Sequence, residues 1–365
     1  MFGKPILNEL TAYKQGMQIK EVQEKYNLDR IIKLASNENP YGYSDKVFTF
    51  IDEVTKDFAF YPDGYAGDIR FQLAEKLQIK PDQLVFGAGS DEIITFICRA
   101  FLSPGTNTVM ALPTFPQYRH HALIEGAEVK EIPTLENGEH DLKEMTKAID
   151  KDTKVVWICS PDNPTGNIVN YEAFTNFMDQ CPQDVVVVLD EAYYEFVNPS
   201  LRYPFHETLE RYPNVIMLRT FSKIHGLAGL RVGYGISSEE LADKLNVVRG
   251  PFNTTSFSQR ICQVALEDDE FVETTRKLNE HVRTQFQQFL DSIQWEYYTS
   301  HTNFLLVKTP IDADEVAEYL LRHGFIVRSG TYLGYPNTLR ITIGTEDDML
   351  QLQNVILQFT KDLKR

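Results

Sequence analysis

Short apolar runs that alternate with helical stretches are the feature that most limits the fold of this chain. The runs at 108–112, 154–159, 184–189 and 215–218 have the length and the branched side chains of buried strands. Strands that alternate with helices in this way are typical of a mainly parallel sheet covered by helices. With 365 residues, the chain is long enough for one large α/β domain and a smaller one.

The character of the sequence changes near residue 250. Polar helical sequence runs from there to about Leu290, and short strands and helices then alternate to the end of the chain. We therefore expect a large domain over residues 30–250. A smaller α+β domain would comprise residues 251–365 together with an N-terminal arm, residues 1–29.

Charge and cysteine content limit the partners. A net charge of −16 argues against nucleic acid and against anionic membranes. It does not exclude an anionic small substrate, because charges beyond about 8 Å are screened at physiological salt. The four cysteines form no C-x-x-C pair, which indicates a reducing compartment and no metal site. No apolar run suits a signal peptide or a membrane span, so we expect a cytoplasmic protein.

Lys223 stands out from the other lysines because it lies between two apolar strands, in RTFSKIHGLAGLRVGY at 219–234. Most lysines are solvated surface charges, and Ser-Lys alone does not change that interpretation. A lysine held between buried strands is poorly hydrated, which lowers its pKa and favours the nucleophilic amine. Such a lysine can form a Schiff base with a carbonyl.

Polar clusters follow three of the expected strands. They contain Phe115, Asn163 and the pair Asp190 and Tyr193. Each has an ordinary alternative, as a core aromatic, a turn residue before proline, or a carboxylate at a strand end. Because parallel strands end at one edge of a sheet, we expect all of them to converge with Lys223 there.

A glycine-rich turn, GAGSDE at 87–92, leads into a helical pattern in which Ser90 is a natural N-cap. Free N–H groups and the helix dipole make such a turn a phosphate site. Glu92 stands where a dinucleotide fingerprint needs its third glycine, and no Walker pattern occurs.

Pyridoxal 5′-phosphate (PLP) would use every one of these features, since it has an aldehyde, a pyridine nitrogen, a ring oxygen and a phosphate. Lys223 would hold the aldehyde, and Asp190 would keep the ring nitrogen protonated. Asn163 and Tyr193 would donate to the ring oxygen, and Phe115 would stack on the ring. The phosphate would be held by Ser90, the Asp91 N–H, Ser222 and Arg231.

Several motifs carry a family resemblance: SNENPYG at 36–42, YPDG at 61–64, GAGSDE, NPTG, DEAYYEF and RTFSKIHGLAGLRVGY. Over nearly its whole length the chain resembles fold-type I PLP-dependent aminotransferases, and among them the histidinol-phosphate aminotransferases. The resemblance implies a mainly parallel sheet of the seven-stranded type and a smaller α+β domain.

The resemblance also assigns roles to residues. It implies that Lys223 moves a proton during catalysis, with Asp190 and Tyr193 beside it. Tyr61 would reach the cofactor phosphate of a neighbouring subunit, so a homodimer with shared active sites is expected. The substrate would be bound by Arg340 in LRITIGT, Arg328 in IVRSG, Asn37 and Tyr13, although Tyr13 lacks the flanking prolines usual in relatives.

The implied reaction transfers an amino group between L-glutamate and a phosphorylated imidazole ketone, in histidine biosynthesis. Transamination of phenylalanine or tyrosine stays open, because both kinds of substrate carry a flat ring, an amine and an anion that arginine binds. A lyase or decarboxylase on the same scaffold is a further alternative. A regulator that binds without turnover would need a DNA-binding module, for which the length and the charge leave no room.

Overall fold

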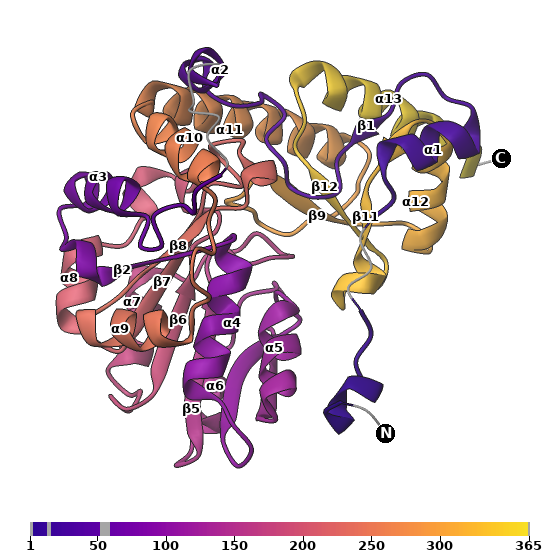
Figure 1. Cartoon of the computed structure of the whole chain (residues 1–365). Coiled ribbons are helices and arrows are strands. Elements are labelled where there is room, and N and C mark those ends of the chain that lie inside the picture. The colour runs from indigo at the N-terminus through magenta and orange to yellow at the C-terminus, as the bar shows by residue number, and fades with distance from the viewer. Residues whose placement is uncertain (1–2, 13–15, 52–58, 364–365) are drawn as a thin grey trace.

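The computed structural model (Figure 1) describes residues 3–12, 16–51 and 59–363. Its largest element is a seven-stranded sheet with the order β2-β8-β7-β6-β5-β3-β4. The strands β3 to β7 pair in parallel, and β8 is antiparallel to both of its neighbours. In chain order they are β2 (Leu84–Gly87), β3 (Asn107–Leu112), β4 (Glu128–Pro133), β5 (Thr153–Cys159), β6 (Val186–Asp190), β7 (Val215–Thr220) and β8 (Gly233–Ile236). The expected mainly parallel sheet is confirmed.

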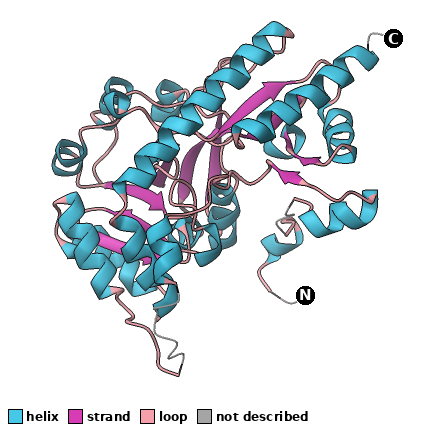
Figure 2. Cartoon of the chain, turned by 90° about the horizontal axis from the view of Figure 1, so that it is seen from above, coloured by secondary structure: helices cyan, strands magenta, loops and turns pink. Residues whose placement is uncertain are grey.

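Helices cover both faces of this sheet, as the view from above in Figure 2 shows. Successive side chains of a strand point to opposite faces, so Val156 and Val155 of β5 lie in two different core clusters. One cluster packs against α4 (Ser90–Phe101), α5 (Gln117–Glu125) and α9 (Glu239–Val248). The other packs against α3 (Gly67–Leu77), α6 (Leu142–Ala148), α7 (Tyr171–Met178), α8 (Phe205–Arg211) and α10 (Ser256–Leu266).

A second core lies around the antiparallel three-stranded sheet β11-β12-β9. Its strands are β9 (Phe304–Lys308), β11 (Arg328–Ser329) and β12 (Thr338–Thr342), and its helices are α11 (Asp269–Ser292), α12 (Ala313–Arg322) and α13 (Glu346–Leu363). The expected smaller α+β part is therefore present as well.

The N-terminal part of the chain joins this smaller part. The short strand β1 (Ile32–Lys33) pairs in parallel with β10 (Phe325–Ile326). Before it, α1 (Ile19–Tyr26) lies beside α12, where the Tyr26 hydroxyl donates to Glu318 at 2.9 Å (Figure 1). After β1 the chain returns to the large part, where α2 (Asp45–Phe50) packs against α10.

The boundaries at residues 30 and 250 stay a prediction, and the packing supports a modified one. Ile32 and Leu34 pack in the core of the smaller part, whereas Ile261, Cys262 and Leu266 of α10 belong to the large core. We propose that the large unit extends through α10 and that β1 belongs to the small one.

Candidate active site

The candidate site lies where β5, β6 and β7 end, beneath the loop at 36–42. Lys223 follows β7 by three residues, and its Nζ donates to the Ser36 carbonyl at 3.3 Å. The same Nζ lies 5.6 Å from the centre of the Tyr193 ring. Gly226 makes this approach possible, because a Cβ there would overlap the Gly42 carbonyl oxygen. A loop from the start of the chain thus covers the lysine.

The surroundings of Lys223 favour its neutral amine. Desolvation is the main reason why its pKa falls to about 8, and the Arg340 guanidinium lowers it further. Asp91 and Glu38 act in the opposite direction. A pKa near working pH suits a group that gains and loses a proton during turnover.

Asp190 ends β6 and is 4% exposed. Its Oδ2 accepts from the Tyr118 hydroxyl at 2.6 Å, and its Oδ1 accepts from the Ala192 N–H at 3.0 Å. Burial raises the pKa of this carboxyl to about 6, although both hydrogen bonds oppose the shift. The carboxylate is thus buried but supplied with donors, as an acceptor for a protonated ring nitrogen has to be.

Tyr118 was not singled out by the sequence analysis. It lies in the first turn of α5 at 0% exposure, where its ring stacks on Trp157 with centres 4.7 Å apart. A tyrosine hydroxyl inside an apolar helix face needs a hydrogen-bond partner, and that was the available signal. Its partner Asp190 is 72 residues away in sequence, which hid the contact.

Tyr193 and Asn37 meet above the strand ends. The Asn37 Nδ2 donates to the Tyr193 hydroxyl at 2.9 Å, and the Asn37 Oδ1 accepts from the Thr342 hydroxyl at 3.1 Å. Burial raises the pKa of Tyr193. Asn37 has a positive φ of 56°, which asparagine tolerates better than most residues. It therefore joins β12 of the small part to the phenol beside Lys223.

Arg340 and Arg328 are brought together by strand pairing. They are direct partners in the antiparallel pair of β11 and β12, so their side chains leave the same face of the sheet. Arg340 donates through Nη1 to the Asn163 Oδ1 at 2.7 Å and through Nη2 to the Ala35 carbonyl at 2.7 Å. The Arg328 guanidinium lies 5.4 Å from the Tyr332 ring centre. Asn163, expected beside the cofactor ring, thus also contacts Arg340.

The glycine-rich turn and Arg231 form a cup at the start of α4. Arg231 donates to the Ser222 hydroxyl at 3.3 Å and lies 4.0 Å from the Asp91 carboxylate. A Cβ on Gly89 would overlap the Arg231 Nη2. The expectation that Ser90 caps the helix is wrong, since Gly89, with a φ of 85°, is the N-cap and no side chain caps α4. An uncapped N-terminus keeps its N–H groups for an anion.

The remaining candidates lie differently. Phe115 packs edge-on against Tyr118, with ring centres 5.5 Å apart. Tyr61 is 82% exposed and stacks on Phe252 with ring centres 4.7 Å apart, so a role for it would involve a second molecule. Tyr13 lies outside the described residues.

Residues 29–356 match the family of class I and II aminotransferases. The chain belongs to the class I and II aminotransferases. This aminotransferase is 52% identical to histidinol-phosphate aminotransferase 2 of Oceanobacillus iheyensis and 47% identical to the histidinol-phosphate aminotransferase of Bacillus pumilus, each over the full length of both chains. The histidinol-phosphate aminotransferase of Sinorhizobium meliloti, solved in complex with PLP, has the same fold, with a TM-score of 0.89 and 24% identity over 99% of this chain and 98% of that one.

PLP is the cofactor of this family, and the residues present fit it. The buried Asp190 carboxylate, the lysine with a lowered pKa and the uncapped start of α4 beside Arg231 match its ring nitrogen, aldehyde and phosphate. Among the described residues, no group of three or more His, Cys, Asp and Glu could hold a metal ion, and no helix is long and apolar enough to cross a membrane.

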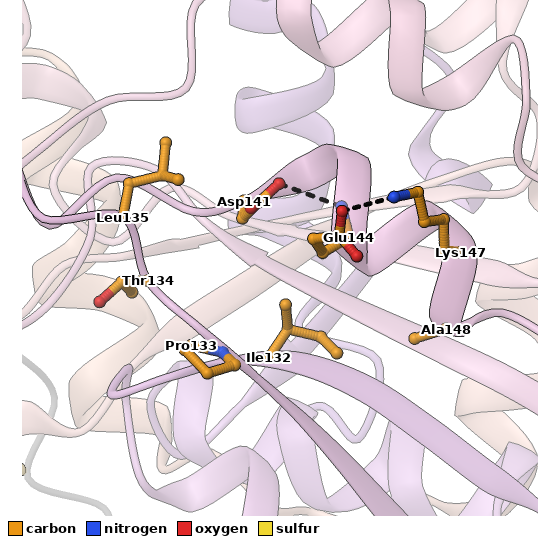
Figure 3. A pocket seen from close by; sticks show the side chains of 8 residues that line it. All are labelled: Ile132, Pro133, Thr134, Leu135, Asp141, Glu144, Lys147 and Ala148. Atoms are coloured by element: carbon orange, nitrogen blue, oxygen red, sulfur yellow. Dashed lines mark hydrogen bonds and ion pairs between the residues drawn. The ribbon is translucent and has the colours of Figure 1, made fainter.

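An open groove of about 550 Å³ lies elsewhere, beside the edge strand β4 (Figure 3). Its polar side chains contact one another or the helix backbone: Asp141 accepts from the Glu144 backbone N–H at 3.0 Å as the N-cap of α6, and Lys147 donates to the Glu144 carboxylate at 2.6 Å. The groove contains none of the candidate residues, so the site has to be identified from its chemistry.

Proposed function

We propose that this aminotransferase transfers an amino group between L-glutamate and the ketone that corresponds to L-histidinol phosphate. The observation that carries this proposal is the pairing of Arg328 with Arg340 on one face of the small sheet, above the strand ends. Two guanidinium groups suit a phosphate monoester in one half-reaction and a carboxylate in the other. The names of the full-length relatives support the same substrate.

We assign the cofactor contacts as follows. When bound, PLP supplies an aldehyde that takes up the amino group and a ring that accepts electrons from the substrate Cα. Asp190, in its ionised form, would hold a proton on the ring nitrogen. Asn163 and Tyr193 would donate to the ring oxygen, and Phe115 would pack on the ring. The phosphate would lie at the start of α4, against Ser90, Asp91, Ser222 and Arg231.

Lys223 has the proton-transfer role in this proposal. Its lowered pKa keeps a substantial share of the amine neutral near pH 8, so it can accept the proton from the substrate Cα. The protonated amine could then give that proton to the cofactor, at the carbon of its aldehyde group. The loop over Lys223 limits access of water to this amine, since Ser36 and Gly42 lie directly against the turn.

We further propose a homodimer with shared sites. Tyr61 is presented outward by a built turn, in which Asp63 accepts from the Tyr65 and Gly67 N–H groups at 2.8 and 2.9 Å. Arg249 fixes the same turn by donating to the Gly64 carbonyl at 2.7 Å. An exposed aromatic side chain on a rigid turn suits contact with a second copy.

The four cysteines are unpaired and buried, which supports a reducing, cytoplasmic setting.

The test compares substrates and an arginine variant. With 2-oxoglutarate as the amino acceptor, we compare histidinol phosphate, phenylalanine and tyrosine as amino donors. We expect kcat/KM to be highest for histidinol phosphate. Arg340→Lys should lower kcat/KM at least tenfold in both half-reactions, because losing a buried charge-assisted contact costs about 2–5 kcal/mol. PLP content should stay normal.

Arg322→Lys is the matched control, because Arg322 lies on an exposed face of α12 and pairs with Glu318 at 3.0 Å. It should leave both half-reactions unchanged. A preference for phenylalanine or tyrosine would replace the proposed substrate. An Arg340→Lys enzyme within twofold of the parent would show that the anion is held elsewhere.

A further inference from the structure

The Asp190–Tyr118 hydrogen bond has the geometry of a charge-assisted contact. Its length of 2.6 Å lies in the range found when a hydroxyl donates to an ionised carboxylate. Both groups are buried, so water does not compete for either. The contact occupies Oδ2, while the Ala192 N–H occupies one side of Oδ1.

The Tyr118 hydroxyl is held in place by a chain of buried contacts. Its ring lies nearly parallel to that of Trp157, with an angle of 12° between them. Trp157 is fixed in turn, because its Nε1 donates to the Thr108 hydroxyl at 2.9 Å and that hydroxyl donates to the Val155 carbonyl at 2.8 Å. The donor is therefore oriented before any ligand binds.

We propose that Tyr118 is a positioning residue: its hydroxyl orients the Asp190 carboxylate and favours the ionised form that a protonated ring nitrogen requires. The inference rests on the proposed function, in which Asp190 pairs with that nitrogen. Tyr118 acts through Asp190 and touches neither substrate nor reacting atoms.

The groups that face Asp190 explain why it needs this donor. Burial raises the pKa of Asp190, and the carboxylates of Asp91 on α4 and Glu191 in the following loop raise it further. Two neutral groups, the Cys159 thiol of β5 and the Tyr193 phenol, also face it. Of the main influences on the pKa of Asp190, two favour the ionised carboxylate: the hydrogen bonds from the Tyr118 hydroxyl and the Ala192 N–H. The pKa of Tyr118 is itself raised well above its usual value, so this residue stays a donor.

The test is Tyr118→Phe, which removes the hydroxyl and keeps the ring that stacks on Trp157. The pKa of Asp190 should rise by about one to two units, because one hydrogen bond to a charged group is lost. In the holoenzyme, the pH titration of the visible absorption band should move upward, because that band reports the protonation of the cofactor with which Asp190 would pair. The rate of the glutamate half-reaction at pH 7 should fall about twofold to tenfold, because a smaller share of Asp190 is ionised at that pH. The acid limb of its pH profile should move to higher pH.

Glutamate is the substrate of choice for this test, because a phosphate monoester titrates near pH 6 and would obscure the limb. KM for glutamate should change less than twofold. Tyr203→Phe is the control, since it removes another largely enclosed hydroxyl, one that donates to the Val169 carbonyl at 2.6 Å and does not contact Asp190. Tyr203→Phe should not shift the pH titration of the visible absorption band.

An unshifted titration and acid limb in Tyr118→Phe would overturn the inference. If that variant does not fold, Trp157→Phe serves instead: it loosens Tyr118 and should give a smaller shift in the same direction, and no shift would again overturn it. A parent enzyme that does not bind PLP or accept an amino group from glutamate would instead refute the proposed function.

Discussion

Replacing Gly226 with alanine should separate the Lys223 turn from the loop that covers it. A Cβ at this position would lie 2.6 Å from the Gly42 carbonyl carbon and would overlap its oxygen. Gly226 also has a φ of 69°, a conformation that alanine adopts only with strain. One of the two loops must therefore move.

The structure gives the expected magnitude. Left-handed backbone strain costs about 1–2 kcal/mol, and overpacking a tight contact costs about 1–3 kcal/mol. Moving the loops apart also breaks the bond from the Asn39 Nδ2 to the Ile224 carbonyl, 2.7 Å long, which contributes about 1 kcal/mol. We expect Gly226→Ala to lower the free energy of unfolding by about 3–6 kcal/mol.

Gly229→Ala is a matched control in the same motif. Nothing lies within 4 Å of a Cβ built there, and its φ is not positive. It should be neutral or stabilising by about 0.4–1 kcal/mol, through the reduced entropy of the unfolded chain. Urea denaturation of both apoenzymes and the absorbance of bound PLP are the assays. Equal denaturation midpoints for the two variants would refute the reasoning.

Two further predictions concern the same site. Lys223→Met should abolish transamination, and its apoenzyme should resist urea better than the parent at pH 7. The sign follows because Lys223, with a folded pKa of about 8, binds fewer protons than in the unfolded chain between about pH 8 and pH 10.5. The stability of the parent therefore rises with pH over that window, and the difference in stability between variant and parent should vanish above about pH 10. A difference that grows with pH would contradict this. If Tyr61 acts across a dimer interface, Tyr61→Ala and Lys223→Met subunits, each inactive alone, should regain activity when refolded together, whereas no recovery in proven mixed dimers would place Tyr61 outside the partner's site.

Sequence patterns located the parts of the site that follow strands. Asp190 stands directly after an apolar run and Lys223 a few residues after another, and the rule that parallel strands end at one edge brings them together. Tyr118 was missed because its sequence context is that of an ordinary core aromatic. Its functional contact is with Asp190, which lies 72 residues away in sequence. The cap at the start of α4 was assigned to Ser90 because propensity favours serine, but the left-handed backbone at Gly89 decides the helix boundary. The pairing of Arg328 with Arg340 depends on strand register, which the short strand β11 does not encode.

The parallel pairing of β1 with β10 has a consequence for how the chain is made. Ile32 emerges from the ribosome early, but its partner Phe325 follows only 293 residues later. At about 5–20 residues per second, translation leaves this segment unpaired for roughly 15–60 s. The large sheet, whose strands all lie between residues 84 and 236, is synthesised completely within that interval. The N-terminal apolar segment, with Ile32, Leu34 and Ala35, therefore lacks its β10 partner until after the whole large sheet has been made.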